Sequence, residues 1–100
     1  MSDTSFEITN NTSEMQFEIL LDGEKAFLSY RFYKKSIAFM HTVVPKSHEG
    51  KGLASALARE AFRYAEEQKK PVMVYCPFVS AFLKRHTAYR KQLDMNYHRP

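Results

Sequence analysis

A change of hydrophobic periodicity near residue 50 constrains the fold of this chain more than any other feature of its sequence. Over residues 25–33 apolar and polar side chains alternate, as they do along a half-buried strand. Over residues 53–65 the apolar side chains recur instead at helical spacing. Pro45 stands between the two patterns, and proline cannot donate a hydrogen bond to a strand ladder. The sequence therefore predicts a sheet built from the first half and an amphipathic helix that covers it.

The order of the predicted elements indicates a mixed sheet. Turn signals divide the first half into an antiparallel meander. Its strands cover residues 6–10, 17–21, 25–33 and 37–44, with turns at 10–13, 22–23 and 34–36. The helix ends before Pro71, and a short apolar strand follows over residues 72–76. Because a strand–helix–strand crossover is right-handed, the last two strands should pair in parallel.

Side-chain patterns add detail at the sheet and at a second helix. Alternation along the strand 37–44 predicts a shared face for Ile37, Phe39, His41 and Val43. A helix over residues 78–86 should turn Phe78, Phe82 and Leu83 inward, and further helical turns are expected within 87–95. The predicted class is an α+β fold forming one domain over residues 1–100. In it an antiparallel meander is joined through a β-α-β crossover to a parallel strand, and helices pack on the sheet.

The composition favours an intracellular globular protein that holds no metal. No apolar run approaches the roughly 18 residues of a membrane span, and the polar N-terminus lacks the layout of a signal peptide. The single cysteine, Cys76, allows neither an intrachain disulfide nor a multi-cysteine zinc site. The four histidines show no metal-ligand spacing; they are His41, His48, His86 and His98.

The charge is distributed unevenly along the chain. Residues 1–24 carry six acidic side chains and no lysine or arginine. Residues 25–100 carry all 15 lysines and arginines against five acids. Such a basic segment attracts a polyanion, either a nucleic acid or a phosphorylated cofactor, although a solvated basic surface has the same composition.

A glycine turn precedes the predicted main helix. Gly50 and Gly52 are two of only three glycines in the sequence, and Lys51 lies between them. Glycine lets a ligand approach the backbone closely, and the first turn of a helix has free N–H groups at the positive end of its dipole. The turn is thus a candidate phosphate site, although such a tripeptide can also simply start a helix.

The residues around this turn resemble a known signature. The segment 41–57 combines a strand, a loop and Gly52-Leu53-Ala54, and it is similar to the acetyl-CoA motif of GNAT-type N-acetyltransferases, Gln/Arg-x-x-Gly-x-Gly/Ala. Glu49 departs from the Gln or Arg of that motif. Cys76-Pro77-Phe78 and residues 82–86 extend the similarity to about residues 15–93. Together these segments resemble one group within the superfamily, the minimal GNAT-like acetyltransferases of about 100 residues.

The resemblance implies an acetyl-CoA site and roles for its residues. Backbone groups of Thr42, Val43 and Val44 would pair with the pantetheine arm, and the amide of Val43 or Val44 would polarise the acetyl carbonyl. The loop that would hold the pyrophosphate comprises Glu49, Gly50, Lys51, Gly52, Leu53, Ala54 and Ser55. Phe78 and Phe82 would line the other side of the arm, or simply pack in the core.

Two residues are candidates for the chemistry. Cys76 would lie beside the thioester and could accept the acetyl group, or it could be an inert buried cysteine. His41 could act as a base for Cys76 or for an acceptor amine, or it could be a half-buried structural histidine. The resemblance alone does not decide between these roles.

The tight turns at 22–23 and 34–36 leave no room for the helices that build an acceptor site in larger GNAT enzymes. An open acceptor side favours a bulky amine, such as one on a protein or peptide. The leading hypothesis is therefore an acetyl-CoA-dependent N-acetyltransferase. A non-catalytic CoA-binding module is the first alternative, and a small basic nucleic-acid-binding domain with stacking aromatics is the second.

Overall fold

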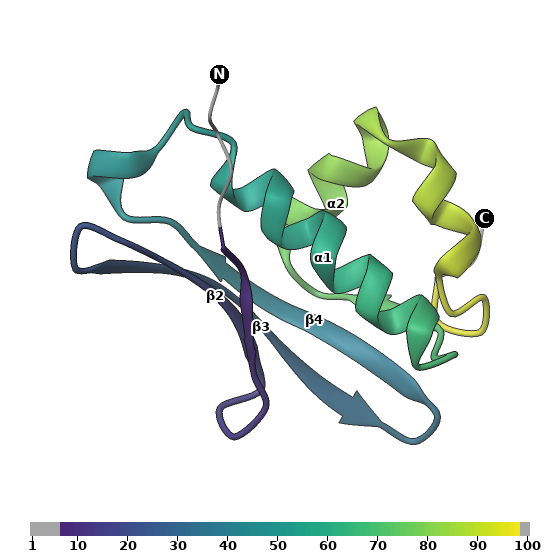
Figure 1. Cartoon of the computed structure of the whole chain (residues 1–100). Coiled ribbons are helices and arrows are strands. Elements are labelled where there is room, and N and C mark those ends of the chain that lie inside the picture. Colours follow the sequence, from purple (N-terminus) through teal and green to yellow (C-terminus); the bar gives the residue numbers. More distant parts are fainter. Residues whose placement is uncertain (1–6, 99–100) are drawn as a thin grey trace.

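Over residues 7–98, one five-stranded sheet and two α-helices make up the fold, as Figure 1 shows. The computed structural model describes residues 7–98. The strands are β1 (Thr9–Asn11), β2 (Gln16–Leu21), β3 (Glu24–Tyr33), β4 (Ser36–Val43) and β5 (Val72–Val74). The helices are α1 (Leu53–Glu67) and α2 (Pro77–Arg85), accompanied by the 3-10 turns η1 (Lys46–His48) and η2 (Thr87–Gln92).

The sheet has the predicted mixed topology. Its strand order is β1-β2-β3-β4-β5; the first four strands are antiparallel, and β5 pairs with β4 in parallel. The chain between β4 and β5 forms α1, which confirms the predicted crossover. The strand predicted over 6–10 corresponds to β1, although its first residue lies outside the described residues. The strand predicted over 72–76 is shorter, because α2 already begins at Pro77.

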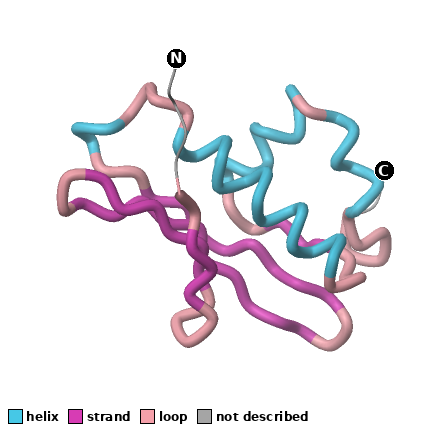
Figure 2. Tube along the Cα trace, viewed as in Figure 1, coloured by secondary structure: helices cyan, strands magenta, loops and turns pink. Residues whose placement is uncertain are grey.

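Both helices pack on the same face of the sheet and give a two-layer structure (Figures 1 and 2). α1 lies over β2, β3 and β4, while α2 lies over β4 and β5. The ring of Phe62 on α1 joins these parts, because its centroid lies 5.1 Å from Phe39 on β4 and 5.1 Å from Tyr89 in η2. Phe82 on α2 stacks on the same ring at 6.3 Å. Burial of this aromatic cluster fixes α1 and α2 against the sheet.

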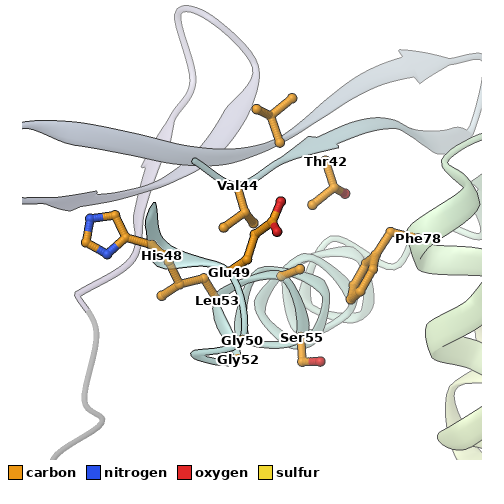
Figure 3. Close-up of a pocket in the computed structure, with 11 residues that line it drawn as sticks. Thr42, Val44, His48, Glu49, Gly50, Gly52, Leu53, Ser55 and Phe78 are labelled. Carbon is orange, nitrogen blue, oxygen red and sulfur yellow. The ribbon is translucent and has the colours of Figure 1, made fainter. Parts of the chain in front are cut away.

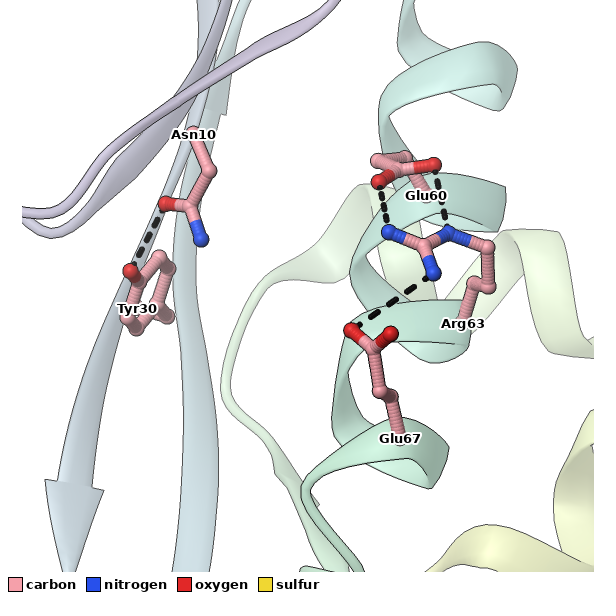
Figure 4. A network of polar contacts seen from close by, with 5 residues as sticks. All are labelled: Asn10, Tyr30, Glu60, Arg63 and Glu67. Atoms are coloured by element: carbon pink, nitrogen blue, oxygen red, sulfur yellow. Dashed lines mark hydrogen bonds and ion pairs between the residues drawn. The ribbon is translucent and has the colours of Figure 1, made fainter.

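Polar side chains at the edge of this core make contacts within α1 and between strands (Figure 4). Arg63 on the solvent face of α1 contacts Glu60 at 2.6 Å and Glu67 at 3.6 Å, one helical turn away in each direction. On the sheet, the hydroxyl of the buried Tyr30 donates a hydrogen bond of 2.8 Å to Asn10 in β1. This bond satisfies the polar end of an otherwise apolar core residue.

A bulge in β4 overturns the predicted alternation along that strand. Ser29 pairs with His41 while the next residue, Tyr30, pairs with Phe39, so Met40 is an extra residue without a partner on β3. Residues that pair across a ladder point to the same face of the sheet. His41 therefore does not share the buried face of Phe39.

Beyond the bulge the faces of β4 are exchanged. Thr42 pairs with the fully buried Leu28 and faces the helices, whereas Val43 pairs with Phe27 and is 46% exposed. The prediction that Ile37, Phe39, His41 and Val43 share one face is thus wrong after Met40. The physical reason is that one inserted residue reverses every later side chain of the strand.

The second helix shows a smaller difference. Phe82 and Leu83 are buried as predicted, but the third buried position of α2 is Val79. Phe78 is only half-buried, because it lies one position earlier on the helix, at the edge facing the end of β4. At this edge the ring of Phe78 lines a pocket instead of packing fully into the core.

Candidate functional site

A pocket opens where β4 and β5 separate. The two strands pair only from Ile37 with Val72 to Phe39 with Val74, and a final hydrogen bond of 2.9 Å joins Tyr75 N–H to the Phe39 carbonyl. The chain beyond β5 turns into α2, whereas β4 continues to Val43. The pocket between them has a volume of about 540 Å³. Its lining comes from the end of β4, the loop after it, the start of α1 and α2; the residues are Thr42, Val43, Val44, His48, Glu49, Gly50, Gly52, Leu53, Ala54, Ser55 and Phe78.

The first turn of α1 forms the polar end of this pocket. Gly50 and Gly52 adopt left-handed conformations, with φ of 85° and 81°, which favour glycine over residues that carry a Cβ. Gly52 is the N-cap of α1, and no side chain caps the helix there. The first helical bond runs from Ala56 N–H to the Gly52 carbonyl at 3.0 Å. The N–H groups of Leu53, Ala54 and Ser55 precede this bond, and the first turn carries no acidic residue. These properties suit a bound anion.

The rest of the pocket is more apolar. Figure 3 shows the ring of Phe78 across the pocket from Thr42 and Val44. The side chain of Glu49 reaches from the loop toward the end of β4, so that its carboxylate lies inside the pocket (Figure 3). A ligand with an apolar arm and an anionic group would fit the two ends, although the Glu49 carboxylate would repel the anion.

Cys76 is not among the lining residues of the pocket, but it contacts Thr42, which is. It is the N-cap residue of α2, is only 3% exposed, and holds its Sγ 3.1 Å from the Oγ1 of Thr42. Sequence reasoning missed this contact, because it depends on the reversal of β4 after Met40. Thr42 is therefore the polar side chain that the fold brings to the Cys76 thiol.

His41 lies elsewhere. It is exposed and lines a separate hollow of about 270 Å³ together with Ser29 and Arg31 of β3 and Glu14 of the turn between β1 and β2. It pairs with Ser29, on the face opposite to Thr42. The structure thus does not bring His41 and Cys76 together.

Three further residues lie at or near the pocket in ways that differ from the site predicted from the sequence. Phe82 belongs to the core and to a neighbouring hollow that also contains Ser55, Phe78 and Arg85. Lys51 is exposed, and its Nζ lies 3.0 Å from His48 Nδ1 rather than in the pocket wall. His48, only 5% exposed, was not predicted as a site residue. The one sequence feature that could have pointed to His48 is its position three residues before Lys51.

Two kinds of site are absent from the part of the chain that the structure describes. Within residues 7–98, no three histidine, cysteine or acidic side chains gather as a metal site would require. In the same range, neither helix is long and apolar enough to cross a membrane.

Comparison with known proteins identifies the family. A family model described as GCN5-related N-acetyl-transferase matches residues 16–93. Protein NATD1 of Danio rerio is 28% identical over 95 residues, which cover 90% of this chain and 86% of that protein. Protein NATD1 of Bos taurus is 29% identical over 82 residues, with coverage of 79% and 73%.

A solved structure shows the same fold. The solution structure of a GCN5-like protein from Staphylococcus aureus superimposes with a TM-score of 0.65 and covers 100% of both chains at 24% sequence identity. The family match confirms the resemblance predicted from the glycine turn and its flanking strand. Since the family model spans most of the sequence, this chain belongs to the GCN5-related N-acetyltransferase family, whose members use acetyl-CoA as cosubstrate.

Proposed function

We propose that this chain binds acetyl-CoA in the pocket at the end of β4 and transfers the acetyl group to an amine of a bulky acceptor, such as a protein or peptide. The observation that carries the proposal is the start of α1 at the end of that pocket. No side chain caps it, and Gly50 and Gly52 before it adopt left-handed backbone conformations. It offers an anion site where a long ligand can continue along the separated strand.

The residues of the pocket suit the two halves of such a ligand. The N–H groups of residues 50–55 would bind the pyrophosphate, and the free backbone edge of Thr42, Val43 and Val44 would bind the pantetheine arm. Phe78 would cover the arm from the other side. When bound, acetyl-CoA supplies an acyl group activated as a thioester.

The backbone N–H of Val43 or Val44 is the proposed donor to the carbonyl oxygen, which becomes negatively charged as the tetrahedral state forms. A fixed backbone donor of this kind costs no reorganisation during the reaction. The amides at the glycine turn would serve only binding, because the phosphates do not react.

Cys76 gives the transfer two routes. In direct transfer, the acceptor nitrogen forms the C–N bond, the C–S bond to CoA breaks, and the amine proton passes to a base while the CoA sulfur gains a proton. In a relay, Cys76 Sγ loses its proton and bonds to the acetyl carbon, the C–S bond to CoA breaks, and the CoA sulfur gains a proton. The acceptor nitrogen then forms the C–N bond, the bond between the acetyl carbon and Cys76 Sγ breaks, and the amine loses a proton as the Cys76 sulfur regains one. Thr42 Oγ1, 3.1 Å away, would hydrogen-bond the Cys76 sulfur in the second route.

His41 has a different place in the proposal. His41 pairs with Ser29 and lies on the face of the sheet opposite to Thr42. From there His41 would act on an acceptor amine rather than on Cys76. The two-residue turns between β2 and β3 and between β3 and β4 leave that side of the sheet without covering helices. This openness supports a large acceptor.

Calorimetric titration with CoA tests the cofactor assignment. Wild-type protein should bind CoA, and Gly52→Glu should lose about a hundredfold in affinity, because it sets a negative charge and a bulky side chain at the anion site. Gly52→Ala is the matched control for backbone strain and should retain most of the affinity. Equal binding by the wild type and Gly52→Glu would place CoA elsewhere.

Intact-mass spectrometry after incubation with acetyl-CoA distinguishes the two routes. An added acetyl group that is present in the wild type and absent from Cys76→Ala supports the relay. Release of CoA in the presence of an amine without acetylated protein supports direct transfer. Binding of acetyl-CoA with neither result would show a non-catalytic module and refute the transferase assignment.

A further inference from the structure

The loop between β4 and α1 contains one deeply buried polar side chain, His48. His48 is only 5% exposed, whereas its neighbours Ser47 and Glu49 are exposed. Figure 3 shows its ring at the outer end of the loop, away from Phe78 and Thr42. A buried imidazole in a surface loop requires polar partners, and the contacts around His48 supply them.

The chemistry of these contacts fixes the role of each ring nitrogen. His48 Nδ1 lies 3.0 Å from Lys51 Nζ, and because an ammonium group has only donors, Nδ1 must accept this hydrogen bond. The hydrogen of the neutral ring is then on Nε2. That nitrogen lies 3.8 Å from Asp22, in the turn between β2 and β3, and 3.8 Å from Glu24, the first residue of β3. Residues 22–24 are called the acidic turn below.

The same turn has a second link to the loop. Ser47 Oγ donates a hydrogen bond of 2.6 Å to Glu24. The acidic turn, the imidazole and the ammonium group therefore form a row, with His48 in the middle. Lysine is long and flexible, and a nearby carboxylate is its ordinary partner. The ring of His48 lies between the Lys51 ammonium and the carboxylates of Asp22 and Glu24, so it keeps this charge on the side of the ring away from them. The backbone of Lys51 lies between Gly50 and Gly52 in the glycine turn.

We infer that His48 is a positioning residue that holds the Lys51 ammonium at the glycine turn for the phosphates of the cofactor. This inference rests on the proposed function, because it assumes that CoA phosphates bind at that turn. It assigns His48 no contact with the reacting atoms. It also makes the acidic turn between β2 and β3 part of the support of the cofactor loop.

A set of substitutions tests the inference by calorimetry with two ligands, CoA and the phosphate-free pantetheine. His48→Leu keeps much of the ring's volume but cannot accept a hydrogen bond. It should weaken CoA binding about fivefold, the scale of one exposed charge contact, and leave pantetheine binding unchanged. His48→Asn is the conservative rescue, because its side-chain oxygen can replace Nδ1 as acceptor, and it should restore most of the CoA affinity.

A double-mutant cycle shows whether His48 acts through Lys51. Lys51→Met alone should weaken CoA binding about as much as His48→Leu, and His48→Leu should have no further effect in the Lys51→Met background. Additive losses would overturn the inference. So would tighter CoA binding by His48→Leu, which would mean that His48 withholds Lys51 from the site, or an equal loss for CoA and pantetheine, which would indicate general damage to the loop.

NMR of the ligand-free wild type separates failure of this inference from failure of the proposed function. Long-range nitrogen–hydrogen spectra report which ring nitrogen of His48 is protonated, and hydrogen on Nε2 alone is expected. Hydrogen on Nδ1 would overturn the contact with Lys51, whatever the protein binds. A wild type with the expected tautomer that binds no CoA would refute the cofactor site while leaving the His48–Lys51 contact intact.

Discussion

The two ends of β4 differ in their pairing with β5 and in what they border. At its start, β4 pairs with β5 over three residues, and the C-terminal segment closes the far edge of β5. There Asp94 N–H donates to the Val72 carbonyl at 2.8 Å, and Val74 N–H donates to His98 Nε2 at 2.8 Å. At its end, β4 has left β5 and borders a pocket of about 540 Å³.

The bulge at Met40 separates these two behaviours. Before it, the apolar side chains of β4 are buried and its backbone pairs on both sides, so this end serves stability. After it, Thr42 faces the helices, Val43 faces solvent, and β5 no longer pairs with the strand. A short strand can therefore provide both core and binding edge, provided that one irregularity divides it.

The largest expected effect would break the closed end. Phe39→Ala removes a fully buried ring that packs edge-on against Phe62 at 5.1 Å, and it should lower the free energy of unfolding by about 3–5 kcal/mol. Urea denaturation measures this loss. Phe32→Ala is the matched control, because Phe32 is 46% exposed on the neighbouring strand and should lose roughly 1 kcal/mol. Similar losses in the two variants would mean that the closed end is not a stabilising core.

A smaller effect would sharpen the description of the open end. Glu49→Gln removes a negative charge from the pocket without changing its shape, and it should tighten CoA binding about threefold to fivefold. Calorimetry at low salt measures the gain. Glu66→Gln makes the same charge change near the other end of α1 and should have little effect. A gain of equal size in both variants would attribute the effect to net charge rather than to the pocket.

The smallest effect concerns the cap on β5. Burial lowers the pKa of His98 below its usual 6.5, so the folded protein favours the neutral ring that accepts from Val74. The unfolded chain then binds more protons, and the contribution of His98 should be present above pH 6.5 and be lost as the pH falls through the lower pKa of the folded protein.

Urea midpoints measured from pH 8 to pH 5 test this expectation (about the range over which a histidine titrates). His98→Gln can still accept from Val74 but does not titrate, so it should flatten part of the fall in stability. His86 lies outside the cap, so His86→Gln should show the same fall in stability at low pH as the wild type. An unchanged profile in His98→Gln would show that the cap does not contribute to the pH dependence.

Much of the architecture was predictable because it depends on local patterns. The alternation of β3 leaves Ala26, Leu28 and Tyr30 buried, and the helical spacing of α1 leaves Leu57, Ala61 and Ala65 buried. The parallel pairing of β5 followed from the order of elements and the handedness of the crossover. The glycine turn was equally local, since left-handed conformations at Gly50 and Gly52 need no distant partner.

The sequence by itself determined the sheet, the main helix and the position of the glycine turn, because periodicity, proline and glycine act through the nearest residues. Only the tertiary structure decided which side chains meet at the pocket. The bulge at Met40 arises from pairing with β3, and it sets Thr42 beside Cys76 and His41 on the other face. The contacts of His48 join residues 22–24 to residue 51, and such distant pairs depend on packing that no local pattern records.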